Sequence, residues 1–173
     1  MRIALEASRV IPQESSHSVL ETHADYSLAE LVGALDEGPL TKLANLPREG
    51  VKRFDTSNTD LFLVTFQKDE NVSASTNYRD YPLSPDLLHW ESQFTTTLKS
   101  AMAKRYIHHR KLGGHIIIAT RFTKKNKVDT AAAYTFLGNV DYVTHRGEKP
   151  IQFEWSLRRD MPKKLYAAGR TVA

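Results

Sequence analysis

The sequence predicts an α+β or closed-barrel domain in which short strands outnumber helices. With 173 residues, of which 40% are hydrophobic, the chain can bury one proper core. Only two segments, 28–35 and 95–106, have apolar residues at helical spacing. Four segments are short, rich in β-branched and aromatic residues, and bounded by Gly, Pro or charged clusters, which predicts strands at 61–66, 115–119, 133–137 and 151–157.

The elements follow in order along the chain. Residues 1–24 are polar and weakly patterned, so they predict an arm. Ser27 and Glu30 then form a capping box, in which the hydroxyl and the carboxylate each satisfy a free amide at the start of the helix 28–35. Residues 39–60 predict a turn-rich connection into the main domain.

The strands predicted near the end of the chain indicate which side of the sheet is buried. Apolar and polar residues alternate over 151–157, which predicts one buried and one wet face. A further strand is predicted at 140–144, joined to 133–137 through Gly138 and Asn139. The predicted division of the chain is a polar arm with helical lead-in, a β-barrel recognition domain and a tail, at 1–57, 58–166 and 167–173.

Charge is distributed unevenly along the chain. The net charge is +4, but residues 1–50 hold 4 bases and 8 acids, whereas residues 51–173 hold 20 bases and 12 acids. Between Glu91 and Asp129 there are nine bases and no acid. Such asymmetry is typical of proteins that contact a phosphate backbone. The alternative for the lysines at 124–127 is a solvated surface loop.

Composition excludes several classes of protein. The chain has no cysteine, so it holds no disulfide and no thiolate metal site, which fits a reducing cytoplasm. No segment approaches the ~18 consecutive apolar residues of a membrane span, and we expect no membrane partner.

The most informative stretch runs from residue 78 to residue 110, where aromatic rings alternate with acids, amides and bases. Recognition of an unstacked nucleobase requires such a mixture, because rings replace the lost stacking while polar groups read the base edge. Carboxylates suit the exocyclic amine of cytosine, and amides suit its carbonyl. The residues predicted to bind a base are Tyr78, Asp80, Tyr81, His89, Trp90, Glu91 and Gln93.

Several of these residues also have an ordinary structural interpretation. Trp90 and at least one tyrosine can be core or hairpin aromatics, and Asp80 can accept backbone amides in its turn. Tyr106 shares a helix face with Leu98 and Met102, so we expect it in the core.

Cationic side chains predict contacts with the DNA backbone, which fix the position of the protein without reading sequence. Arg105 has a rival interpretation, an internal pair with Asp80 or Glu91. His108 and His109 flank a helix end, where a histidine can satisfy terminal carbonyls. The predicted backbone contacts are Arg79, Arg105, His108, Arg110, Lys111, Lys124, Lys125 and Lys127.

Hydrolase chemistry has no supporting motif. The chain lacks a His-Glu-x-x-His helix and a Gly-x-Ser-x-Gly turn, and the adjacent His108 and His109 point apart on a helix or a strand. The sequence therefore predicts a protein that is not an enzyme, with no cofactor and no metal. A metal-dependent nuclease using histidines with Asp80 and Glu91, and a protein-docking module suggested by the acidic first fifty residues, are the alternatives.

A set of motifs resembles the family called domain of unknown function 3427. The motifs are Tyr78-Arg79-Asp80-Tyr81, Ser84-Pro85, His89-Trp90-Glu91-Ser92-Gln93, Arg105-Tyr106-Ile107, Tyr134-Thr135-Phe136-Leu137-Gly138 and Asp141-Tyr142-Val143. The resemblance continues through His145, Gly147, Glu148 and Pro150 to Trp155, Leu157 and Met161-Pro162, so it covers about residues 58 to 162. The segment 27–35 resembles the helical lead-in found upstream.

The resemblance implies an SRA/PUA-like antiparallel β-barrel with one or two helices. It also implies binding of duplex DNA that carries 5-methyl- or 5-hydroxymethylcytosine, by flipping the modified base into an aromatic pocket. The family typically forms the C-terminal part of bacterial superfamily 2 helicases, often with a phospholipase-D-type nuclease, in restriction-like systems. This chain has no Gly-x-x-x-x-Gly-Lys-Ser/Thr segment, so a helicase or nuclease subunit is the implied partner.

Overall fold

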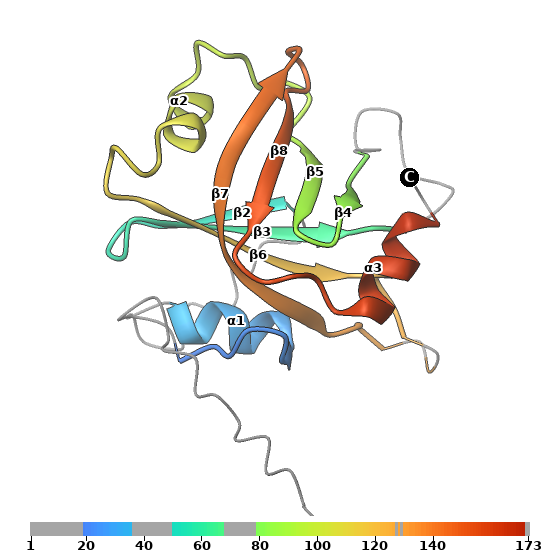
Figure 1. Cartoon of the computed structure of the whole chain (residues 1–173). Coiled ribbons are helices and arrows are strands. Elements are labelled where there is room, and N and C mark those ends of the chain that lie inside the picture. The colour runs from blue at the N-terminus through green and yellow to red at the C-terminus, as the bar shows by residue number, and fades with distance from the viewer. Residues whose placement is uncertain (1–18, 36–49, 68–78, 127, 129, 172–173) are drawn as a thin grey trace, which may run out of the picture.

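The computed structural model describes residues 19–35, 50–67, 79–126, 128 and 130–171. Strands dominate, and three short helices accompany them in this part of the chain (Figure 1). In chain order the elements are β1 (Asp25–Tyr26), α1 (Leu28–Leu35), β2 (Gly50–Phe54), β3 (Thr59–Thr65), β4 (Tyr81–Ser84), β5 (Leu87–Glu91), α2 (Ala101–Ile107), β6 (His115–Arg121), β7 (Tyr134–Arg146), β8 (Gln152–Leu157) and α3 (Lys163–Arg170).

The strands form one sheet in the order β2-β3-β6-β7-β8-β5-β4, with β1 added beside β7. Only β3 and β6 pair in parallel; the other pairs between named strands are antiparallel. Among the described strands the path ends at β2 and β4, so the sheet is open. The α+β class predicted from the sequence is confirmed.

The long strand β7 connects the two halves of the sheet. Its first part pairs with β6 and its second part with β8. At the junction the register shifts, because Ile118 faces Gly138 while Ala119 faces Phe136, which leaves one extra residue in β7. Gly138 has φ 83°, a backbone conformation that side chains with a Cβ rarely adopt. The bulge therefore lets β7 pass from one half to the other, and the turn predicted at Gly138 and Asn139 is absent because the strand is continuous.

Two cores lie on opposite faces of β3. Phe62 and Val64 belong to a core between the two halves of the sheet (the inter-sheet core), where Phe62 stacks on Trp90 with ring centroids 4.2 Å apart. Leu61 and Leu63 point the other way, into a second core covered by α1. Side chains alternate along a strand, so a segment that reads as one apolar run is buried on both faces. This explains why every residue of β3 is buried.

The helices match the sequence in part. The capping box at α1 is confirmed, since the Ser27 amide donates to Glu30 Oε2 (2.7 Å) and the Glu30 amide donates to Ser27 Oγ (3.2 Å). The second predicted helix is shorter than expected because Ser100 caps it, with Oγ accepting from the Ala103 amide at 3.2 Å. Helix α3 and the strands β1, β2, β4 and β5 were not predicted.

Candidate functional site

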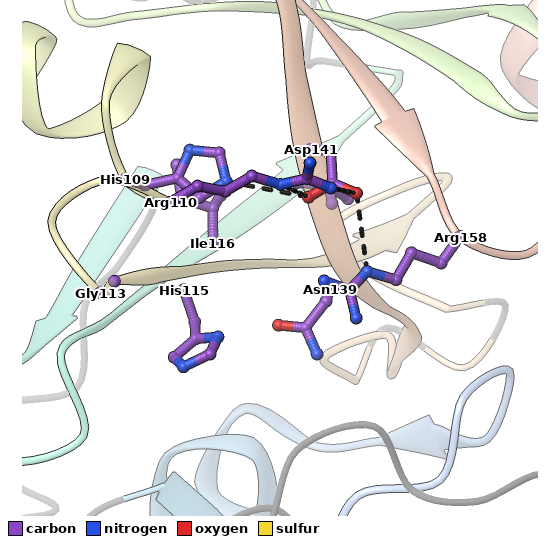
Figure 2. Close-up of a pocket in the computed structure, with 10 residues that line it drawn as sticks. His109, Arg110, Gly113, His115, Ile116, Asn139, Asp141 and Arg158 are labelled. Atoms are coloured by element: carbon purple, nitrogen blue, oxygen red, sulfur yellow. Dashed lines mark hydrogen bonds and ion pairs between the residues drawn. The ribbon is translucent and has the colours of Figure 1, made fainter.

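The structure has a polar pocket of about 220 Å³ beside the end of α2 (Figure 2). Four segments form it: the residues after α2, the turn into β6, the middle of β7 and the residue after β8. The first two segments are nearly continuous, whereas the middle of β7 and Arg158 lie well apart from them in the sequence, and the bend of β7 brings all four together. The lining residues are His109, Arg110, Gly113, Gly114, His115, Ile116, Asn139, Val140, Asp141 and Arg158.

Asp141 places a carboxylate in this pocket. The residue before it, Val140, enters the inter-sheet core, so the alternation of β7 turns Asp141 to the other side. Arg110 Nε donates to Asp141 Oδ1 at 2.7 Å, and the same guanidinium contacts Oδ2 through a second nitrogen. Arg158 Nε lies 3.6 Å from Oδ2 (Figure 2). One carboxylate thus faces two guanidinium groups, which leaves the pocket cationic.

His109 forms part of the pocket wall and is 4% exposed. Its Nδ1 lies 2.9 Å from the Tyr106 carbonyl oxygen, so Nδ1 must carry the hydrogen that this oxygen accepts. In the neutral ring Nε2 is then a lone-pair acceptor. Nε2 is buried, has no hydrogen-bond partner among the described residues, and lies 4.0 Å from Asp141 Oδ1. The prediction that a histidine satisfies a carbonyl at this helix end is confirmed for His109.

Exposed cations surround the pocket. His108, Arg110 and Lys111 are exposed at the end of α2 and, with Tyr142, line a second hollow of about 170 Å³. Arg110 is shared by both hollows, and its side chain is 68% exposed. We refer to His108, Arg110, Lys111 and Arg158 as the α2-end surface.

The acid-free segment does not form a single basic surface. Strand β6 runs from His115, beside the pocket, to Arg121, and Lys124 and Lys125 follow its far end. At about 3.3 Å per residue, the strand separates these lysines from the α2-end surface by roughly 20 Å. Lys124 and Lys125 therefore belong to a second basic region, apart from the α2-end surface, and their contact with a DNA backbone stays a prediction. Lys127 lies outside the described residues.

Arg105 does not face outward as a free phosphate ligand. Its Nε donates to Asp60 Oδ2 at 2.8 Å and a terminal nitrogen donates to Oδ1 at 2.9 Å. Arg53 donates to the same carboxylate at 3.1 Å. The internal interpretation of Arg105 is correct, although its partner is Asp60 and not Asp80 or Glu91. Burial favours this pair because an enclosed carboxylate needs a cation and several donors.

Trp90 is a core residue. It is 4% exposed, and its ring lies between Phe62, at 4.2 Å, and the more distant rings of Tyr106 and Phe153. The alternation of β5 directs Leu88 and Trp90 to this side. The core interpretation of Trp90 is therefore correct, and the expectation that its ring lines an open cavity is wrong.

The carboxylates of Asp80 and Glu91 each accept a hydrogen bond from a backbone amide of the neighbouring segment. Asp80 Oδ1 accepts a hydrogen bond from the Glu91 amide at 3.0 Å. Asp80 therefore accepts a backbone amide, as its structural interpretation predicted. Glu91 Oε2 accepts from the Arg79 amide at 3.0 Å, and Oε1 accepts from Gln152 at 3.2 Å. Burial opposes ionisation of Glu91, but the His89 ring 3.9 Å away and these donors outweigh it, so the pKa of Glu91 is lowered.

The other described residues predicted to bind a base lie on and beside the β4 and β5 pair. Tyr81 stacks on the buried His89 with centroids 4.6 Å apart. Gln93 is exposed after β5, and Arg79, which was predicted as a backbone contact, is exposed before β4 at the same end of this antiparallel pair. Tyr78 lies outside the described residues.

Arg110 was predicted as a backbone contact, but Asp141 and His109 were not predicted as binding residues, because no local pattern marks them as a pair. Asp141 and His109 are separated by 31 intervening residues, so nothing in either local segment links the two side chains. The one available signal is an acid in a strand whose neighbours, Val140 and Tyr142, are apolar and aromatic. Such an acid faces away from the core and needs a cationic partner if it is partly enclosed.

The comparison with protein families decides the affiliation of the chain. The family described as Domain of unknown function (DUF3427) matches residues 21–168, which include α1 and every described strand of the sheet. The chain belongs to this family. A search of curated proteins found no match to it.

In the part that the structure describes, no helix has the length and apolarity needed to cross a membrane. Among the same residues, no three His, Asp or Glu side chains are grouped so that they could hold a metal ion.

Proposed function

We propose that this chain is a non-catalytic domain that binds duplex DNA through the α2-end surface and inspects an extruded, modified cytosine. The observation that supports this most directly is the polar pocket that contains Asp141 and is flanked by Arg110 and Arg158. A cationic rim attracts the phosphate backbone, while a small polar hollow suits the edge of a flat ring.

The size of the pocket agrees with a single ring. Sites for drug-sized ligands occupy roughly 300–1,000 Å³. The pocket beside Asp141 is about 220 Å³ and is bordered by side chains that hydrogen-bond. A base that leaves the stack loses its hydrogen bonds, so a pocket that replaces them lowers the cost of extrusion.

The finer features of the proposal come from the family resemblance. We propose that the sheet is a variant of the SRA/PUA-like barrel, which the passage of β7 from β6 to β8 around an enclosed core supports. We further propose a cytoplasmic restriction or defence system in which a helicase or nuclease subunit acts on the DNA that this domain recognises.

Salt-dependent binding tests the DNA-binding part. Removing one phosphate contact lowers the slope of log affinity against log salt by ~0.9 and weakens all duplexes alike. We expect this for Lys111→Ala, since Lys111 is exposed beside Arg110. Lys164→Ala, an equal loss of charge on α3, is the control and should leave the slope unchanged. Affinity that does not change with salt would refute the proposal.

Three duplexes that differ only in one cytosine test the recognition part. Plain, 5-methylated and 5-hydroxymethylated DNA should bind with different affinities at equal salt, and equal affinity would leave only sequence-independent DNA binding. An added chelator should change neither the binding nor the integrity of the DNA. DNA cleavage that the chelator abolishes would favour the metal-dependent nuclease instead.

A further inference from the structure

The pocket beside α2 offers an unusual pair of acceptors, and we infer that it recognises the exocyclic amine of an extruded nucleobase. Asp141 and His109 are the specificity-determining residues in this inference. It rests on the proposed function, because a base reaches the pocket only when DNA lies on the α2-end surface.

The buried nitrogen of His109 supports an amine ligand. Its Nδ1 already donates to the Tyr106 carbonyl, so Nε2 of the neutral ring can only accept. This atom has no hydrogen-bond partner among the described residues, although it is enclosed at the pocket wall. An enclosed polar atom without a partner is costly, and a donor from a ligand removes that cost.

Asp141 supplies the second acceptor next to it. The distance from His109 Nε2 to Asp141 Oδ1 is 4.0 Å, so one amino group between them could donate a hydrogen to each (Figure 2). The pocket also presents donors on the β7 and β8 side, from Asn139 and Arg158. Acceptors next to donors match an edge on which an amine adjoins a ring nitrogen that accepts.

Cytosine and adenine share this edge, because each has an amino group beside an unprotonated ring nitrogen. Uracil and hypoxanthine place a carbonyl oxygen where the amine would be. That oxygen would face the Asp141 carboxylate and the His109 lone pair, so both bases should be rejected.

Arg110 must release Asp141 for the base to bind. In the free protein its guanidinium covers both carboxylate oxygens. The Arg110 side chain is 68% exposed and that of Asp141 is 21% exposed, so water reaches the pair from the Arg110 side and weakens it. A backbone phosphate at the α2-end surface can accept the same guanidinium in a bidentate contact. Contact with the backbone and opening of the carboxylate are thereby coupled.

Paired duplexes test the inference. Each duplex carries cytosine, uracil, adenine or hypoxanthine opposite an abasic site, where extrusion of the base costs least. We expect roughly tenfold tighter binding of the amino base in at least one pair, cytosine over uracil or adenine over hypoxanthine. Asp141→Asn should abolish that preference, because its amide can turn to donate to a carbonyl. Asp86→Asn, the same charge change in the β4–β5 turn, should preserve it.

The outcomes separate the two proposals. Salt-dependent binding of all four duplexes with equal affinity overturns this inference and leaves DNA binding intact. Absence of DNA binding overturns the proposed function and this inference with it. Arg110→Ala provides a second measurement that does not depend on the carboxylate: it should weaken every duplex and keep the amino-base preference. Loss of the preference in Arg110→Ala, or its survival in Asp141→Asn, would contradict the inference.

Discussion

Asp60, at the second position of β3, accepts two parallel hydrogen bonds from Arg105 of α2. The carboxylate is 1% exposed and takes a third hydrogen bond from Arg53 on β2. The pair fixes α2 against the sheet, and α2 in turn positions His109 and Arg110 at the pocket. The hydrogen bonds to Asp60 raise the pKa of Arg105, and they outweigh burial, which acts to lower it.

Asp60→Asn should destabilise the protein by about 3 kcal/mol, because two guanidinium groups lose their counter-charge at a buried position. Chemical denaturation at neutral pH measures the change. Asp55→Asn, which alters an exposed partner of Arg53, is the matched control and should cost far less.

Arg105→Lys should lower the melting temperature and leave the salt dependence of DNA binding unchanged. Lysine keeps the charge but cannot make both hydrogen bonds to Asp60. If the variant keeps its stability and loses salt-dependent affinity, then Arg105 contacts phosphate and the internal interpretation is wrong.

Trp90→Ala should cost about 3–5 kcal/mol, since it removes a large ring from the inter-sheet core. Trp90→Phe keeps a ring against Phe62 and should remain folded with an unchanged preference among modified duplexes. If the Trp90→Phe protein is folded but no longer distinguishes modified from plain DNA, then Trp90 contributes to base binding and is not only a core residue.

Glu91→Gln should reduce stability by about 1–3 kcal/mol at neutral pH, since the variant loses charged hydrogen bonds. The pKa of Glu91 lies below its usual value of 4.5 in the folded protein. Its stabilisation is therefore complete above that value and disappears as the pH falls through the lowered pKa. Unfolding measured from pH 7 downward should show wild type and variant converging at acidic pH. A difference that does not change with pH would rule out the charge as the cause.

Gly169→Ala should destabilise the contact between α3 and β4 by about 1–3 kcal/mol. A Cβ at this position would lie 2.7 Å from Cδ of Pro82 and 3.1 Å from Cε2 of Phe66. Alanine otherwise favours a helix interior over glycine by ~1 kcal/mol. A higher melting temperature in the variant would therefore show that α3 does not press on Pro82.

Local patterns predicted the structure correctly where the contacts that form an element lie within one segment. Ser27 and Glu30 cap α1 within a single turn, and the apolar and polar alternation of β8 marks its two faces. The missed strands β4 and β5 contain charged and histidine residues that resemble a binding motif. Their polar side chains are satisfied by hydrogen bonds and a stacked ring from neighbouring segments, which a local pattern does not show.

The amino-acid sequence by itself determined the α+β class, the first helix with its cap, and the positions of the central strands, because these depend on spacing between near neighbours. Only the tertiary structure decided which cations are exposed and which acid faces a pocket. Arg105 and Arg110 are five positions apart in the same basic segment, yet one pairs with Asp60 inside and the other reaches Asp141 at the surface. The reason is physical: the partner of a charge is chosen by the bend of β7 and the placement of α2, which contacts between distant residues determine.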